Sequence, residues 1–342
     1  MKETKCPLCR EKKKTVYCIA RDNQNHDNEF NEFIIAECIG CGFLYLNPVP
    51  QPDEIALFYP KYYWIGEKRK FIEKISPSLF SASYEKAKYV TKYKKQGSIL
   101  DVGCAEGFFL KHMKMQGWDV TGIDFSEQAI SYGKKHLGLE LYVGEVVKLE
   151  RKIKRKFDVI TLWATLEHVY DPLETVEAAK KLLTEDGILI YAVPNMGSIQ
   201  AKIFGKYWLH LDVPRHLCFF TPETARLLCD KTGLTIKEMS YQSIEHNPGG
   251  WIYSFLYCLR DIKRKIKGQG RKEQDSGNHD SDQSDIVNDK QKETAPLSIP
   301  KKIFYWFVDN GMVMLFVPIT RIEALLKRGG TITVIAEKKR NM

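Results

Sequence analysis

The sequence predicts an α/β protein in which helices cover both faces of a mainly parallel sheet. Two observations support this prediction. Between residues 96 and 244 short apolar runs alternate with amphipathic stretches, and a glycine-containing turn follows the first apolar run. Strands that alternate with helices in this way form parallel sheets covered on both faces.

The expected strands are short and rich in Ile, Leu and Val, and they cover residues 98–102, 119–124, 139–143, 157–162, 188–193, 234–240 and 331–336. The expected helices have apolar residues at helical spacing and cover residues 108–116, 172–183 and 222–231. Ser126 is a helix N-cap with Glu127 in the first turn. Asp186-Gly187 marks the turn before the fifth strand.

Composition excludes two broad classes. The 342 residues are 44% hydrophobic and include 17 Phe, 17 Tyr and 6 Trp, enough apolar area for two or three domains, so a disordered chain is excluded. The strongly apolar stretch 303–320 is interrupted by Asp309 and Asn310, which argues against a polytopic membrane protein. The polar start, 1–10, predicts no secretory signal peptide.

Charge and cysteine content indicate the environment. The net charge of +9 fits an anionic partner but does not choose between nucleic acid, anionic lipid and a phosphorylated substrate. Nine cysteines, an odd number, favour a reducing compartment over a disulfide framework. We therefore expect a cytoplasmic protein.

Two Cys-x-x-Cys pairs predict a structural zinc site. Cys6 and Cys9 form one pair, Cys38 and Cys41 the other, and 28 residues separate them. Each spacing lets two thiolates reach one tetrahedral zinc ion. The alternatives are a redox pair or buried cysteines. Cys18 lies in an expected strand and is interpreted as a core residue.

The turn after the first strand predicts a nucleotide-like ligand. Gly103 and Gly107 let the backbone approach a ligand closely, ahead of a helix N-terminus. Asp124 ends the second strand, 21 residues after Gly103, where a carboxylate accepts hydrogen bonds from ribose hydroxyls. The alternative is a turn that serves packing only.

These residues resemble the class I S-adenosylmethionine-dependent methyltransferases. Asp101-Val-Gly-Cys-Ala-Glu-Gly107 is similar to the family's first motif, with Ala105 where glycine is commoner. Residues 157–172 resemble the fourth-strand motif of the branch that includes quinone-biosynthesis and sugar methyltransferases. The resemblance implies S-adenosylmethionine as cofactor, held by Asp101, Gly103, Cys104, Ala105, Gly107, Asp124, Phe125, Glu145 and Trp163.

The resemblance also implies the architecture. We expect a Rossmann-like seven-stranded methyltransferase sheet whose last, antiparallel strand is inserted between strands five and six. A small amino-terminal zinc-ribbon-like module, which occurs in this branch as a substrate-side cap, precedes it. The expected regions are the module (1–50), a helical linker (51–95), the methyltransferase domain (96–244 with 331–342) and a helical insertion between the last two strands (245–330).

Three histidines are candidate catalytic residues. A base is needed when the acceptor is a hydroxyl or a carbon acid. His168 follows the fourth strand, and Glu167 would orient it; alternatively, Glu167 is a structural acid and His168 caps the loop. His210 and His216 lie with Asp212 and Arg215 in a cluster after strand five. The alternative for that cluster is a hydrogen-bonded loop that holds helix 222–231.

The insertion contains two apolar segments flanked by cations, 251–267 and 303–321. This pattern suits helices lying on an anionic membrane surface, or a helical lid or dimer contact. Between them, residues 268–298 are almost free of apolar side chains, so we expect disorder.

The leading functional hypothesis is methyl transfer to a small-molecule acceptor, a sugar or lipid-linked glycan of cell-surface biosynthesis, at the inner membrane face. An RNA methyltransferase that grips RNA with the zinc module is the second. It is disfavoured because the basic residues are scattered and Asn195-Met-Gly does not match the motif of base-amino methyltransferases. A non-catalytic cofactor-binding module is the third. Nothing in the sequence indicates the oligomeric state.

Overall fold

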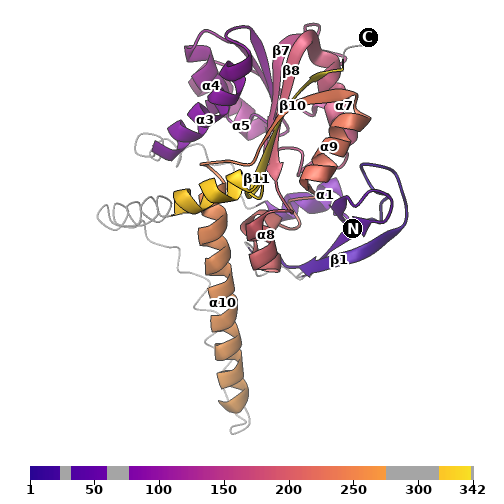
Figure 1. Cartoon of the computed structure of the whole chain (residues 1–342), viewed down its shortest axis with the longest axis vertical. Helices are drawn as coiled ribbons and strands as arrows, with labels where there is room; N and C mark the ends of the chain where they lie inside the picture. The colour runs from indigo at the N-terminus through magenta and orange to yellow at the C-terminus, as the bar shows by residue number, and fades with distance from the viewer. Residues whose placement is uncertain (24–31, 60–76, 275–315, 340–342) are drawn as a thin grey trace.

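The computed structural model describes residues 1–23, 32–59, 77–274 and 316–339 (Figure 1). Its main element is a seven-stranded sheet in the order β10-β11-β8-β7-β4-β5-β6. The strands are β10 (Leu234–Ser240), β11 (Thr331–Lys338), β8 (Leu183–Pro194), β7 (Phe157–Trp163), β4 (Ser98–Val102), β5 (Asp119–Asp124) and β6 (Glu140–Val143). Only β11 runs antiparallel to its neighbours, β8 and β10. The predicted α/β class and the inserted antiparallel strand are therefore confirmed.

Helices cover both faces of this sheet, as Figure 1 shows. One face packs against α3 (Pro77–Tyr93), α4 (Phe108–Met115) and α5 (Glu127–Tyr132), the other against α7 (Pro172–Leu182) and α9 (Pro222–Lys231). The helix starts follow from local chemistry. The Ser126 side chain accepts a hydrogen bond from the Ala129 N–H, so the predicted N-cap is confirmed.

The remaining helical segments in the described residues are short, apart from α10 and the helix at 316–325. They are α1 (Pro52–Ile55), η1 (Ala56–Phe58), the π-helix η2 (Gly133–Leu137), α6 (Val146–Leu149), α8 (Ile199–Phe204), η3 (Gly205–Tyr207) and η4 (Leu209–Leu211).

A second, four-stranded antiparallel sheet is built mainly from the amino-terminal residues. It consists of β1 (Lys14–Ala20), β2 (Phe33–Cys38), β3 (Leu44–Leu46) and β9 (Cys218–Phe219). Its fourth strand, β9, comes from the region expected to belong to the methyltransferase domain. Phe220, the next residue, forms a bridge with Asn195 after β8. The two sheets are thus joined, while the proposed division into four regions stays a prediction.

Several predicted boundaries are wrong by a few residues. β8 begins at Leu183 instead of residue 188, because the buried Leu183 pairs with Phe157 of β7; the expected turn at 186–187 lies within the strand. By contrast, the sixth strand ends at Ser240, as the residue pattern predicts, and not at Ile244, where the resemblance would place its end.

The insertion between β10 and β11 contains α10 (Asn247–Gln274), the longest of the described helices, which stands away from the rest of the molecule in Figure 1. Residues 268–274 are therefore helical, against the expected disorder. Gly268 and Gly270 are poor helix formers, but the Gln, Arg, Lys and Glu residues beside them are good ones, and a helix already nucleated extends at little cost. Residues 275–298 and 303–315 lie outside the described residues, and 316–325 are helical.

Polar contacts fix the base of α10. Gln200 Nε2 donates to the Asn247 carbonyl at 2.9 Å and to Glu323 at 3.1 Å, and Trp251 Nε1 donates to Glu323 at 3.1 Å. Further along, Tyr207 donates to Asp261 at 2.5 Å. None of the described helices is long and apolar enough to cross a membrane.

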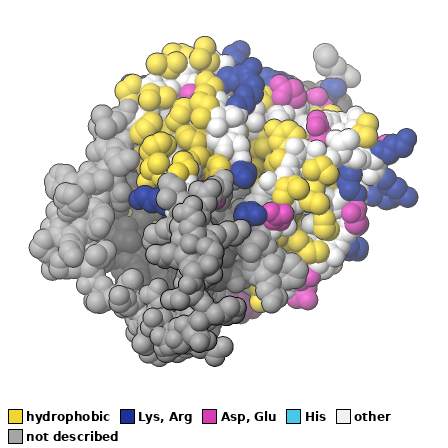
Figure 2. Space-filling view, turned by 90° about the horizontal axis from the view of Figure 1, so that it is seen from below, with side chains coloured by type: hydrophobic (Ala, Val, Ile, Leu, Met, Phe, Trp, Pro, Cys, Tyr) yellow, Lys and Arg dark blue, Asp and Glu magenta, His cyan; other side chains and the backbone are white. Residues whose placement is uncertain are grey.

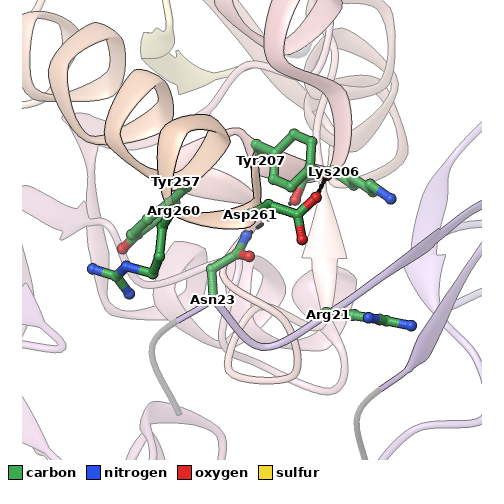
Figure 3. A pocket seen from close by; sticks show the side chains of 7 residues that line it. All are labelled: Arg21, Asn23, Lys206, Tyr207, Tyr257, Arg260 and Asp261. Atoms are coloured by element: carbon green, nitrogen blue, oxygen red, sulfur yellow. Dashed lines mark hydrogen bonds between the residues drawn. The ribbon is translucent and has the colours of Figure 1, made fainter. Parts of the chain in front are cut away.

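A shallow pocket lies where the amino-terminal residues, η3 and α10 meet (Figure 3). In Figure 3 the Arg21 and Lys206 side chains extend to one side and the Arg260 side chain extends to the other, so the three cations do not converge. The Asn23 side chain donates to the Lys206 carbonyl at 3.0 Å. The pocket is therefore better described as a junction between three segments than as a convergent anion site.

A buried guanidinium joins the amino-terminal residues to the segment before β9. Arg215 is 1% exposed, and all of its nitrogens have partners. Nη2 donates to Asp22 at 2.8 Å and to Asp212 at 2.6 Å, while Nη1 donates to the Phe58 carbonyl at 3.0 Å. Because these groups are buried, losing one partner leaves charge that nothing compensates.

We therefore expect Asp22→Asn to lower the free energy of unfolding by about 3 kcal/mol, measured by urea denaturation. Glu32→Gln, which removes one partner of the exposed Arg21–Glu32 pair, is the matched control and should change stability little. Equal effects of the two substitutions would contradict the role given to Arg215.

Candidate active site

The turn between β4 and α4 forms a cradle at the carboxyl end of the sheet. Gly103 has φ +79° and donates its N–H to the Ile123 carbonyl at 2.7 Å. A Cβ at Gly103 would lie 2.3 Å from Thr165 Oγ1, so only glycine lets the β7 loop approach this closely. Gly107, with φ +88°, precedes the first turn of α4.

Asp124 stabilises this cradle from the end of β5. Its Oδ2 accepts the Ala105 N–H and its Oδ1 accepts the Ser126 N–H, both at 2.8 Å. Burial raises the pKa of Asp124, and the two backbone donors oppose this shift. Sequence reasoning assigned Asp124 only to a ligand and missed this structural role.

Ala105 has φ +47°, in the left-handed region. A Cβ costs about 1 kcal/mol or more in that conformation. Alanine in place of the commoner glycine therefore stores strain in the turn.

Asp101 lies beneath the cradle at the end of β4. It is 3% exposed and accepts a hydrogen bond from Thr161 Oγ1 at 2.6 Å. Burial raises the pKa of Asp101 to about 7, against the opposing effects of Thr161 and Lys86. Asp101 is therefore a carboxyl that titrates near neutral pH.

The other expected cofactor residues lie around the cradle in different environments. Cys104 is buried, and a Cβ at Gly122 would lie 2.6 Å from its Sγ, so Cys104 packs tightly on β5. Burial raises the pKa of this thiol well above its usual value, as expected for a packed residue rather than a nucleophile. Phe125 is 57% exposed.

The side chains of Glu145 and Trp163 are paired or buried and are not open to the cradle. Gly144 donates its N–H to the Asp124 carbonyl at 2.8 Å, which brings Glu145 near the cradle, but the Glu145 carboxylate pairs with Lys148 at 2.8 Å. Trp163 is buried, with its ring 5.7 Å from that of Phe109. Its Nε1 has no hydrogen-bond partner in the described residues.

Two of the candidate catalytic histidines come together with Glu167. One ligand atom from each of Glu167, His168 and His216 lies within 4.8 Å of the others. His168 Nδ1 lies 3.0 Å from the Arg215 carbonyl oxygen, and His216 Nδ1 lies 2.9 Å from the His210 carbonyl oxygen. Burial raises the pKa of Glu167 to about 8 and lowers that of His216 to about 3. We call these three residues the Glu-His-His cluster.

The third candidate, His210, has its side chain elsewhere. Its Nε2 lies 3.1 Å from the His246 carbonyl oxygen, and its ring packs against Trp208. Burial lowers its pKa to about 4. The structure therefore separates His210 from the Glu-His-His cluster, and its contacts suit the alternative of a loop-holding residue.

The four expected metal-binding cysteines also come together. Cys6 Sγ lies 3.7 Å from Cys41 Sγ, and Cys9 Sγ lies 3.4 Å from Cys38 Sγ. All four sulfur atoms lie within 4.8 Å of one another. A tetrahedral zinc ion with Zn–S bonds of about 2.3 Å has S···S distances of about 3.8 Å, so the arrangement fits zinc.

Comparison with known proteins gives the class. A family model described as "Methyltransferase domain" matches residues 71–238. "Ubiquinone biosynthesis O-methyltransferase" from Aromatoleum aromaticum is 30% identical over 169 residues, 46% of this chain and 70% of that protein. The Actinobacillus pleuropneumoniae serotype 7 protein of that name is 32% identical over 157 residues, 41% of this chain and 67% of that protein. The Haemophilus ducreyi protein is 30% identical over 156 residues, and the chain spans 66% of its length.

A solved structure, a SAM dependent methyltransferase from Archaeoglobus fulgidus, aligns with 79% of this chain and 99% of its own, with 15% identity and a TM-score of 0.46. The sheet order, the cradle and the relatives define a methyltransferase that uses S-adenosylmethionine. The chain belongs to the class I S-adenosylmethionine-dependent methyltransferase family.

We expect Ala105→Gly to raise the free energy of unfolding by about 0.5 kcal/mol, because relief of the left-handed strain exceeds the entropy that glycine adds to the unfolded chain. Gly103→Ala should lower it by more than about 1 kcal/mol. Thermal unfolding of both variants beside the wild type tests this pair. A stabilised Gly103→Ala protein would show that the described turn geometry is wrong.

Proposed function

We propose that this protein transfers a methyl group from S-adenosylmethionine to a hydroxyl oxygen of a small molecule. The observation that carries the proposal is the position of the Glu-His-His cluster. Glu167 and His168 follow β7 on the same loop as Thr165, whose Oγ1 donates to the Val102 carbonyl at 3.1 Å beside the cradle. Side chains that can help an acceptor hydroxyl lose its proton thus lie close to where the methyl donor would bind.

The cradle fits the proposed cofactor through its donor set. Each Asp124 carboxylate oxygen accepts one backbone N–H, which leaves lone pairs for ribose hydroxyls. Ionised Asp101 would supply negative charge beside a cationic ligand. The remaining proposed cofactor residues provide backbone, packing or edge contacts, and they are Gly103, Cys104, Ala105, Gly107, Phe125, Glu145 and Trp163.

S-adenosylmethionine supplies an activated methyl group on a positively charged sulfur. Positioning of the acceptor in line with that group therefore does much of the work. The cluster's part is to help the acceptor hydroxyl lose its proton, because a neutral hydroxyl is a weak nucleophile. His168 and His216 are the proposed catalytic residues, and we assign His210 to the support of the loop.

For the acceptor we propose a sugar or a lipid-linked glycan. Its support is the apolar surface of the insertion, since a lipid-linked acceptor needs such a surface nearby. A second candidate is the phenolic hydroxyl of a quinone precursor. It is favoured by the relatives named for ubiquinone biosynthesis.

The proposal extends to a peripheral contact between the insertion and an anionic membrane surface. Figure 2 shows hydrophobic side chains gathered in patches with Lys and Arg beside them. Large apolar side chains on α10 and on the helix at 316–325 are between 38% and 83% exposed. They are Tyr253, Phe255, Leu256, Leu259, Ile262, Ile319, Ile322 and Leu325. Cationic residues such as Lys263 flank them, the pattern of interfacial helices.

We also propose that Cys6, Cys9, Cys38 and Cys41 hold a structural zinc ion. Four thiolates fill a tetrahedral site, so this zinc has no open position for a substrate. Its role is to fix the two Cys-x-x-Cys knuckles next to β1 and β2.

The titration of Asp101 gives a pH dependence. Because the pKa of Asp101 is raised to about 7, the carboxyl is protonated below that pH and ionised above it. A cationic ligand favours the ionised form, so S-adenosylmethionine affinity should be up to about tenfold weaker at pH 6 than at pH 8. Calorimetric titration of the wild type and of Asp101→Asn tests this. An Asp101→Asn protein that keeps the full pH dependence would exclude Asp101 as its source.

The deciding experiment uses S-adenosylmethionine with a labelled methyl group. It is incubated with purified protein, source-cell extract and vesicles containing anionic lipid, and label is measured in lipid, glycan, quinone-precursor, RNA and protein fractions. Alkali-stable ether label in the lipid or glycan fraction is the expected result. Label in a quinone precursor would select the second acceptor, and label in RNA would overturn the small-molecule proposal.

Two variants serve as controls for that experiment. Asp124→Ala should abolish most of the label and weaken S-adenosylmethionine binding at least about tenfold, since it loses the ribose acceptor. Asp119→Asn removes an exposed carboxylate from the start of the same strand and should behave as the wild type. Absence of label in every fraction, together with undiminished cofactor binding, would favour a non-catalytic cofactor-binding module.

A further inference from the structure

The Glu-His-His cluster has features that a hydrogen-bonded loop does not need. Glu167 is 1% exposed and His216 is 7% exposed. Glu167 Oε2 is buried and has no hydrogen-bond partner in the part of the chain that the structure describes. A buried carboxylate oxygen without a partner is costly, so a bound group that satisfies it would stabilise the site.

The hydrogen bonds of the two histidines determine where their lone pairs lie. The Nδ1 atoms of His168 and His216 each face a main-chain carbonyl oxygen, at 3.0 Å and 2.9 Å. A carbonyl oxygen accepts only, so each Nδ1 bears the proton and each Nε2 keeps its lone pair. Histidines that bind metals are held in this way by a carbonyl or carboxylate on the opposite nitrogen.

The charges around the cluster also favour a bound cation. Three buried carboxylates, Asp22, Asp212 and Glu167, share this region with one buried guanidinium, Arg215. Arg215 is fully engaged with Asp22, Asp212 and the Phe58 carbonyl. His216 Nε2 lies 4.0 Å from Asp212 Oδ2. With Glu167 ionised, these groups carry a net charge of −2, which one divalent cation would balance.

We propose that Glu167, His168 and His216 bind a divalent transition-metal cation through a Glu167 oxygen and the two Nε2 atoms. Two imidazoles and one carboxylate select ions such as Zn²⁺, Fe²⁺ or Mn²⁺ over Mg²⁺ and Ca²⁺, which prefer oxygen ligands alone. Three protein ligands leave coordination positions open, in contrast to the closed four-thiolate site.

This inference rests on the proposed function for its chemical role. A hydroxyl oxygen bound at an open position becomes more acidic, because the cation stabilises the oxygen anion. The proton then leaves to water, and the oxygen lone pair forms the bond to the methyl carbon while the carbon–sulfur bond breaks and sulfur keeps that electron pair. In this arrangement the histidines act as ligands, so neither Nε2 receives the proton.

The test uses Co²⁺ as the probe, with the full chain and with zinc retained in the four-thiolate site. We expect one additional Co²⁺ per chain, with ligand-field absorption and no thiolate-to-cobalt charge-transfer band. Glu167→Gln and His216→Gln should each weaken Co²⁺ binding at least about tenfold. Glu174→Gln and His136→Gln remove an exposed carboxylate and an exposed imidazole, and they should leave it unchanged.

Folding is checked independently, because substitutions in a buried cluster can unfold a protein. Wild-type protein that retains zinc in the four-thiolate site should rise in melting temperature when Co²⁺ is added, and this readout needs no variant. Cys41→Ser should lose zinc from the thiolate site and keep the Co²⁺ signal. Absence of Co²⁺ binding outside the thiolate site, or binding that survives both cluster substitutions, overturns the inference.

Activity separates the inference from the proposed function. Full methyl transfer by metal-stripped protein would overturn the metal's role while leaving the methyltransferase proposal intact. Stoichiometric Co²⁺ binding at the cluster without methyl transfer to any hydroxyl acceptor would overturn the proposed function and leave the metal site intact.

Discussion

The architecture of the site depends on one buried interaction, the guanidinium of Arg215 between Asp22 and Asp212. The cost of burying this charge is offset only when both carboxylates are in place. Asp22 follows β1, whereas Asp212 and Arg215 lie between η4 and β9. The guanidinium can therefore be satisfied only when the amino-terminal residues are folded against the sheet that carries the cradle.

That constraint extends directly to the Glu-His-His cluster. The carbonyl of Arg215 faces His168 Nδ1, and His216 is the next residue along the chain. Leu217 donates its N–H to the Glu167 carbonyl at 2.7 Å, and its own carbonyl accepts the Leu46 N–H at 2.9 Å. One short segment thus contacts the β7 loop on one side and the amino-terminal sheet on the other. The amino-terminal residues are part of the structure that positions the cluster and do more than cover it.

Features set by neighbouring residues could be predicted from the sequence, and features set by distant ones could not. The strands Ser98–Val102, Asp119–Asp124 and Leu234–Ser240 were predicted to the residue, because period and flanking turns are local signals. The cysteine cluster was predictable from spacing. Nothing local distinguishes His216, which reaches Glu167, from His210, which does not. That difference depends on how the segment after η4 crosses the β7 loop.

Electrostatics link the cradle to the cluster. Asp101 and Asp124 are buried beside the cradle without a salt-bridge partner in the described residues, which suits a ligand that brings its own positive charge. At the cluster, Glu167 likewise has a buried carboxylate oxygen without a partner in the described residues. A neutral acceptor hydroxyl brings no charge, so a cationic cofactor compensates the first pair of carboxylates and does nothing for Glu167. The two ends of the site therefore need two separate sources of positive charge, and this separation makes a metal ion at the cluster physically reasonable.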